Sequence, residues 1–155
     1  MQLTTNFSLE ELIYSETAKR LGISNMPNAT EQASLKLLAE NILQPLRNHF
    51  GPIHVSSGFR SAALNKATPG SSATSQHSKG EAADIDMDGI ATNVTNAMIF
   101  DYIHKFLPFD QLIWEYGTDT NPDWVHVSFS PSGHQRKQAL RCKRNSAGQP
   151  VYTNY

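Results

Sequence analysis

The sequence is poor in cysteine, in net charge and in long apolar runs. Its 155 residues include one cysteine, Cys142, which excludes an internal disulfide and any cysteine-based metal cluster. Thirteen basic residues against fourteen acidic ones leave a net charge of -1, so no overall field attracts nucleic acid. No apolar run approaches the ~18 residues of a membrane span, and the N-terminal MQLTTNFSLEE lacks the basic and apolar regions of a Sec signal. We therefore expect a monomer made in the cytoplasm, with neither nucleic acid nor membrane as a partner.

The chain does contain enough apolar residues to close one core, because the set AVILMFWYC makes up 39% of it. Apolar residues at helical spacing predict helices over 7–21, 31–50 and 92–107. Period-two alternation and flanking turn residues predict strands over 53–57, 82–87, 111–116 and 124–130. Helices that come first, followed by strands with one interposed helix, favour a single α+β domain with a small antiparallel sheet.

Within this domain, 1–155, we distinguish a helical N-terminal part at 1–52, a core at 53–130 and a basic C-terminal segment at 131–155. The basic residues of that segment crowd into positions 136–144. Two interpretations of this segment stay open. It could be a solvated tail or last hairpin, or it could form a binding patch.

Three residues in the core have the chemistry of metal ligands. His77 lies in the serine-rich loop at 66–80, Asp84 on the acidic face of the next strand, and His126 on the polar face of the last one. Two imidazoles and one carboxylate suit zinc, and three protein ligands leave a fourth position open for water, as in catalytic zinc sites. The sequence therefore predicts that the core of the domain carries one Zn2+ ion.

These residues also belong to a recognisable pattern. The stretch SQHSKGEAAD at 75–84 matches the S-x-H-x-x-G-x-A-x-D signature of the M15 zinc peptidases, and WVHVS at 124–128 resembles the strand with their last ligand. SGFRS at 57–61 resembles a segment upstream of that signature. The order of FSLEELIYSETA, LQPLR and SSGFRS is similar to that of a subgroup often encoded in bacteriophages, and the family fold is related to the hedgehog signalling domain.

The resemblance implies a zinc-dependent hydrolase of peptidoglycan stem peptides, either a D-alanyl-D-alanine carboxypeptidase or an L-alanyl-D-glutamate endopeptidase. His77, Asp84 and His126 would bind the zinc, and Arg60 would bind a substrate carboxylate or carbonyl, for which its planar fork is suited. A phage lysin that reaches the cell wall through a membrane lesion would reconcile this substrate with the missing signal.

The general base has two candidates. Glu115 ends the strand at 111–116, next to the histidine strand if the two form a hairpin. Asp123 lies three residues before His126, but Asn-Pro-Asp is ordinary turn chemistry, so Glu115 is favoured.

Three further residues are expected to line the substrate site. Ser75 and Gln76 orient the ligand loop, and Trp124 forms a wall of the cleft. The alternative to an enzyme is a non-catalytic module in which zinc only braces the fold and the basic segment binds the cell wall or a phage structure.

Overall fold

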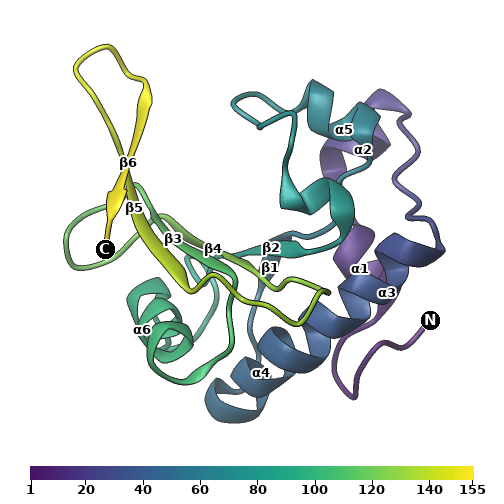
Figure 1. Ribbon diagram of the computed structural model, residues 1–155, viewed down its shortest axis with the longest axis horizontal. Helices are drawn as coiled ribbons and strands as arrows, with labels where there is room; N and C mark the ends of the chain where they lie inside the picture. Colours follow the sequence, from purple (N-terminus) through teal and green to yellow (C-terminus); the bar gives the residue numbers. More distant parts are fainter.

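A six-stranded sheet organises the chain, with the strand order β1-β2-β4-β3-β5-β6 (Figure 1). The computed structural model describes all residues, 1–155. Its strands are β1 (Val55–Ser57), β2 (Ala82–Ile85), β3 (Gln111–Glu115), β4 (Trp124–Ser128), β5 (Gln138–Arg144) and β6 (Pro150–Asn154). The expected α+β class is confirmed, and every strand predicted from alternation is present.

The helices lie in the first third of the chain, between β1 and β2, and between β2 and β3. They are α1 (Leu9–Ile13), α2 (Glu16–Leu21), α3 (Ala29–Leu38), the π-helical turn η1 (Ala39–Leu43), α4 (Gln44–Phe50), α5 (Ala62–Ala67), the 3-10 turn η2 (Gln76–Lys79) and α6 (Asn96–Phe106). The single helix predicted over 7–21 is wrong. The chain leaves α1 at Tyr14, and Ser15 starts α2 because its side chain accepts a hydrogen bond from the Ala18 amide.

The helix predicted over 31–50 is continuous but not uniform. It begins at the capping box of Asn28 and Glu31, and its middle turn, η1, widens to π geometry just before Pro45. Proline has no amide hydrogen to donate to the preceding turn, so a change of hydrogen-bond pattern there costs little. The apolar stripe stays aligned across the change, because Leu38, Ile42 and Leu46 are all fully buried.

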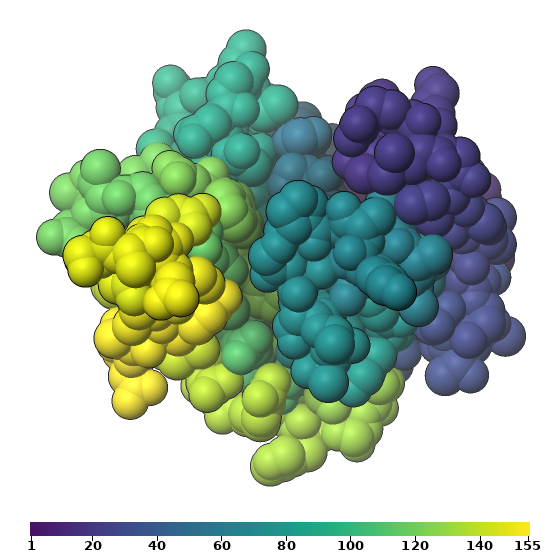
Figure 2. All heavy atoms as spheres, turned by 90° about the horizontal axis from the view of Figure 1, so that it is seen from above, coloured from purple at the N-terminus to yellow at the C-terminus, as the bar shows by residue number.

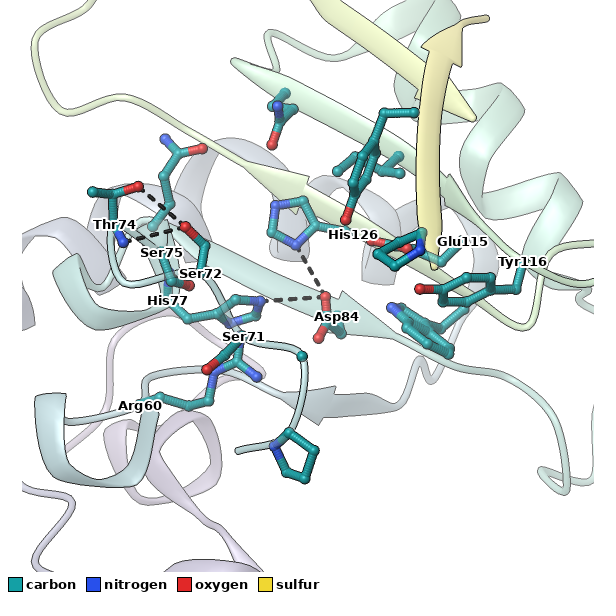
Figure 3. A pocket seen from close by; sticks show the side chains of 18 of the residues that line it. Arg60, Ser71, Ser72, Thr74, Ser75, His77, Asp84, Glu115, Tyr116 and His126 are labelled. Carbon is teal, nitrogen blue, oxygen red and sulfur yellow. Dashed lines mark hydrogen bonds and ion pairs between the residues drawn. The ribbon is translucent and has the colours of Figure 1, made fainter. Parts of the chain in front are cut away.

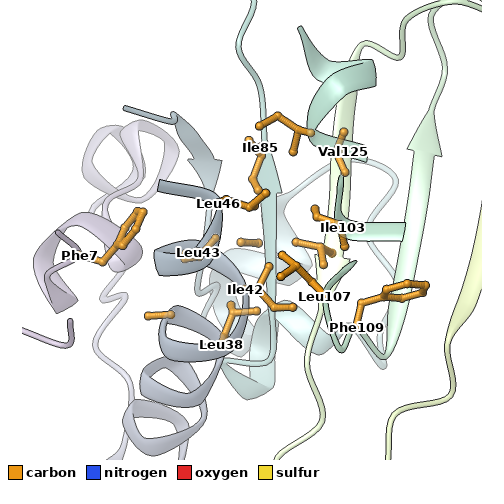
Figure 4. Packing of buried hydrophobic residues seen from close by; sticks show 14 of the residues in the cluster. Phe7, Leu38, Ile42, Leu43, Leu46, Ile85, Ile103, Leu107, Phe109 and Val125 are labelled. Carbon is orange, nitrogen blue, oxygen red and sulfur yellow. The ribbon is translucent and has the colours of Figure 1, made fainter. Parts of the chain in front are cut away.

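The core lies between one face of the sheet and the helices that cover it. Figure 4 shows residues of α3, η1 and α4 facing Ile85 of β2 and Val125 of β4, with Ile103 of α6 beside them. Helical spacing alone would also place Met98 and Phe106 of α6 in this core, but both are exposed. None of the helices is both long and apolar enough to cross a membrane.

The other face of the sheet is left for polar side chains. In the antiparallel β2–β4 pair, Asp84 lies opposite His126, and in the β3–β4 pair Glu115 lies opposite Trp124. Side chains alternate between the two faces of a strand, so residues that pair across strands share a face. The register thus carries Asp84, His126 and Glu115 together on the face opposite the core.

The basic segment at 131–155 is not a loose tail, because it contains the β5–β6 hairpin. Contrary to the expectation of a purely antiparallel sheet, β5 pairs with β3 in parallel, from Gln111 with Gln138 to Glu115 with Cys142. β4 ends beside the start of β3, and the link at 129–137 is short, so β5 must start at that same end. Asp110 fixes the link there, since its backbone carbonyl accepts a hydrogen bond from the Gln138 amide at 3.0 Å.

Candidate active site

Three side chains from two strands and one turn meet on the polar face of the sheet. The Nε2 atom of His77 lies 3.3 Å from Oδ1 of Asp84, and Nδ1 of His126 lies 3.1 Å from the same oxygen. One ligand atom from each of the three residues falls within 4.8 Å of the others. Figure 3 shows the two imidazoles converging on the carboxylate.

The turn that carries His77 is fixed on several sides. Ser75 caps η2 by accepting a hydrogen bond from the His77 amide, and Gly80 ends it in the left-handed conformation, at φ 72°. A Cβ on Gly80 would lie 2.4 Å from the carbonyl oxygen of Glu31, so only glycine allows this approach to α3. The carbonyl of Gly58 lies 2.7 Å from Nδ1 of the buried His77 ring.

This arrangement fits a zinc ion. A carbonyl can only accept a hydrogen bond, so Nδ1 of His77 carries the proton and Nε2 offers a lone pair towards Asp84. In tetrahedral zinc sites, bonds of about 2.0–2.2 Å place neighbouring ligand atoms roughly 3.3 Å apart, close to the two separations observed here. Burial alone would raise the pKa of Asp84, but in the metal-free protein positively charged rings at His77 and His126 would outweigh this effect and hold that pKa far below its usual range.

A cavity of about 530 Å³ lies over the three side chains. One wall is the segment from Arg60 to His77, the other is the C-terminal hairpin, and Figure 2 shows the hollow between these teal and yellow parts of the surface. The floor is the polar face of the sheet, with Asp84, His126 and Glu115. A peptide in this cavity would therefore pass directly over the metal ligands.

Arg60 lies on the His77 side of the cavity (Figure 3). Its backbone amide donates to the carbonyl of His77 at 3.2 Å, and its Nε is buried without a hydrogen-bond partner. Burial lowers the pKa of the guanidinium, against the opposing effect of the Asp84 charge. The residue as a whole is half-buried and lines the cavity, where its planar guanidinium can bind an incoming carboxylate or carbonyl.

The two candidates for the general base occupy different environments. Glu115 is 8% exposed and lines the cavity on the side of Asp84 opposite Arg60 (Figure 3). Burial raises its pKa to about 7; the charge of His126 opposes this shift and that of Asp84 adds to it. Asp123 is exposed and lies outside the cavity lining.

The residues expected to line the substrate site all reach the cavity. Ser75 and Trp124 are among its lining, and the Trp124 ring meets Tyr116 edge to face, with centroids 5.4 Å apart. The Gln76 side chain donates to Glu81 and to Asp110, each at 3.1 Å. Those bonds hold its amide in place and link the ligand turn to the start of β3.

The cavity also contains residues that the sequence analysis did not single out. Tyr116 has a positive φ of 53°, which is uncommon for a residue other than glycine, and it follows Glu115 directly. Arg144 and Tyr152 come from the hairpin, and the Arg144 guanidinium lies 4.3 Å from the centre of the Tyr116 ring. Neither QALRCKR nor PVYTN alternates regularly between apolar and polar residues, so local periodicity gives little signal for these two strands.

The basic side chains of the C-terminal segment have partners within the domain. Arg136 forms two-pronged hydrogen bonds with Asp110, Lys137 bonds the carbonyl of Leu107, and Lys143 pairs with Asp119. The Arg141 guanidinium contacts the rings of both Trp114 and Tyr155, at 4.5 and 4.9 Å from their centres. These contacts give the basic cluster a structural role in holding the hairpin to the sheet.

Comparison with known proteins agrees with this geometry. The family model described as Peptidase M15 matches residues 5–128, which include all three metal-binding candidates, Arg60 and Glu115. No curated protein matches the chain. With a match over most of its length and a His77–Asp84–His126 cluster able to hold a metal ion, the chain belongs to the Peptidase M15 family of metallopeptidases.

Proposed function

We propose that this protein is a zinc-dependent peptidase that hydrolyses an amide bond in the stem peptides of bacterial peptidoglycan. The observation that carries the proposal is the placement of Arg60 and Glu115 on opposite sides of the His77–Asp84–His126 cluster, within one cavity. A cation that binds the substrate and a carboxylate that moves a proton are what amide hydrolysis needs beside a metal.

The proposed roles follow from the environment of each group. His77, Asp84 and His126 would hold zinc, whose chemistry at such a site, when bound, is Lewis acidity towards a carbonyl oxygen and a water molecule. Arg60 would orient the peptide by binding its carboxylate or carbonyl oxygen. Glu115 would accept a proton from the attacking water and pass it to the leaving nitrogen, which a carboxylate with a pKa near neutrality does well.

Ser75, Gln76 and Trp124 are proposed to shape the substrate site. Trp124 lies opposite Glu115 in the β3–β4 register, so its ring can pack along the substrate beside the proton-transfer group. Ser75 and Gln76 act through the ligand turn, which their hydrogen bonds hold in place.

Digestion of purified sacculi tests this proposal. We expect mass spectra of the treated stem peptides to show either loss of one D-alanine, for a carboxypeptidase, or a new N-terminal D-glutamate, for an endopeptidase. A chelator should prevent this change and added zinc should restore it. A change that occurs equally well in chelator would contradict the metal mechanism, and stem peptides left unchanged by zinc-loaded protein would contradict the proposed substrate.

The resemblance to phage-encoded relatives extends the proposal to a lysin that degrades the wall from within an infected cell. The expected result is lysis when the protein is expressed in the cytoplasm together with a membrane-permeabilising protein, and no lysis when either is expressed alone. A non-catalytic wall-binding module would instead sediment with sacculi without lysing the cells or releasing peptides.

A further inference from the structure

The C-terminal hairpin forms one wall of the cavity, although the family match ends at residue 128, the last residue of β4. From β6 it contributes Pro150 and Tyr152 to the lining, and from β5 Arg144. Figure 2 shows this hairpin facing the segment that carries Arg60 and His77 across the hollow. The substrate site is therefore completed by a part of the chain to which the family match assigns no role.

The strand register brings Tyr152 into line with Glu115. Glu115 pairs with Cys142 across β3 and β5, and Cys142 pairs with Tyr152 across β5 and β6. Cross-strand partners share a face of the sheet, so Tyr152 lies on the same face as Glu115 and His126. The two groups are close enough that, after burial, the Glu115 charge is the largest cause of the raised pKa of the Tyr152 phenol.

The hairpin is held from its other face. Tyr155 packs against Phe100 and Trp114, and the Arg141 guanidinium contacts the rings of both Trp114 and Tyr155. The Tyr155 amide donates to the carbonyl of Ala139 at 3.0 Å. These contacts fix the position of β6, so Tyr152 is not needed as an anchor.

The Tyr152 hydroxyl lacks a strong partner within the domain. The residue is 52% exposed, and its hydroxyl makes no hydrogen bond to another group of the domain; the thiol of its cross-strand neighbour Cys142 is only a weak acceptor. A raised pKa keeps the phenol protonated at neutral pH, so it can donate a hydrogen bond. The nearby carboxylate of Glu115 disfavours a second anion there, which leaves a neutral carbonyl oxygen as the matching acceptor.

We propose that Tyr152 is a substrate-binding residue, whose hydroxyl donates a hydrogen bond to a backbone carbonyl oxygen of the stem peptide on the Glu115 side of the scissile bond. This inference rests on the proposed function and adds the C-terminal hairpin to the substrate site.

The test compares Tyr152→Phe with Tyr155→Phe, which removes a hydroxyl from the same hairpin on the opposite face. With zinc-loaded protein and a soluble stem peptide, we expect Tyr152→Phe to lower kcat/KM by about 3- to 13-fold, the effect of one lost hydrogen bond. The zinc content, the midpoint of urea unfolding and the acid limb of the pH profile of kcat/KM should stay at wild-type values. Tyr155→Phe should change kcat/KM less than twofold.

Binding gives a second readout that is independent of turnover. In the Glu115→Gln background, calorimetric titration with the same peptide should show a Kd raised by a similar factor when Tyr152 is replaced by Phe. An unchanged kcat/KM and Kd, an equal loss in the two tyrosine variants, or an effect confined to the acid limb would overturn this inference alone. Wild-type protein that neither binds nor cleaves the peptide would overturn the proposed function, and this inference with it.

Discussion

Replacing His77 with alanine is expected to abolish hydrolysis and zinc-dependent stabilisation together. The ring is buried and would supply one of the three proposed ligand atoms, so two ligands would remain and zinc affinity would collapse. Turnover of the stem peptide should fall by about 10³-fold or more. Zinc at 100 times its Kd should stabilise the wild type by about 2.7 kcal/mol and the variant hardly at all, as measured by urea unfolding with and without chelator.

The matched control for this substitution is His134→Ala, since that histidine is exposed and its side chain makes no hydrogen bond within the domain. It should keep full zinc content and activity. The comparison also separates an enzyme from a zinc-braced binding module. If zinc stabilises the wild type but no cell-wall peptide is ever cut, the metal has only a structural role.

Replacing Glu115 with glutamine is expected to lower kcat by about 10²–10⁴-fold, the usual contribution of a general base, while zinc content stays the same. Glutamine keeps the size of the side chain but cannot accept the proton of the attacking water. Single-turnover kinetics on the stem peptide should locate the loss in the chemical step. A loss confined to KM would instead assign Glu115 to substrate binding.

The same substitution should stabilise the zinc-free protein at high pH. The pKa of Glu115 is about 7 in the folded protein against an ordinary value of 4.5, so the folded state binds more protons between these two pH values. The stability that the neutral carboxyl gives is therefore full below pH 4.5 and is lost as pH rises through 7, by about 3 kcal/mol in total. Unfolding in chelator should show Glu115→Gln more stable than wild type at pH 8, with the difference gone at pH 4.5.

Asp123→Asn is the control for both Glu115 experiments, because this aspartate is the other candidate base and is exposed. It should retain most of kcat and show the wild-type dependence of stability on pH. A large loss of kcat in Asp123→Asn together with an active Glu115→Gln would reverse the assignment.

The metal-binding cluster could be predicted from the sequence because its members follow a local pattern. Alternation in the 82–87 and 124–130 segments places Asp84 and His126 on polar faces, and one antiparallel pairing is enough to bring them together. The remaining candidate, His77, comes from a turn only a few residues before Asp84. The short separation between His77 and Asp84 and the two-residue period of the strands made this part of the site predictable.

The cavity wall formed by the C-terminal hairpin could not be predicted in the same way. β5 follows β4 in the chain but pairs in parallel with β3, and the aromatic rings that hold the hairpin come from α6, β3 and the C-terminus. Such long-range pairing leaves little trace in local periodicity, and the high charge of the segment favoured a solvated tail. The burial that distinguishes Glu115 from the exposed Asp123 also depends on this hairpin, whose position could not be predicted from the sequence.

The hydrogen bonds around His77 couple two functions of the site. Gly58 accepts from the imidazole, and two residues later the Arg60 amide donates to the His77 carbonyl, so the ligand and the guanidinium belong to one hydrogen-bonded unit. Metal occupancy and recognition of a carboxylate should then be thermodynamically linked. By reciprocity, a peptide held by Arg60 should tighten metal binding by the same factor by which the metal tightens binding of the peptide.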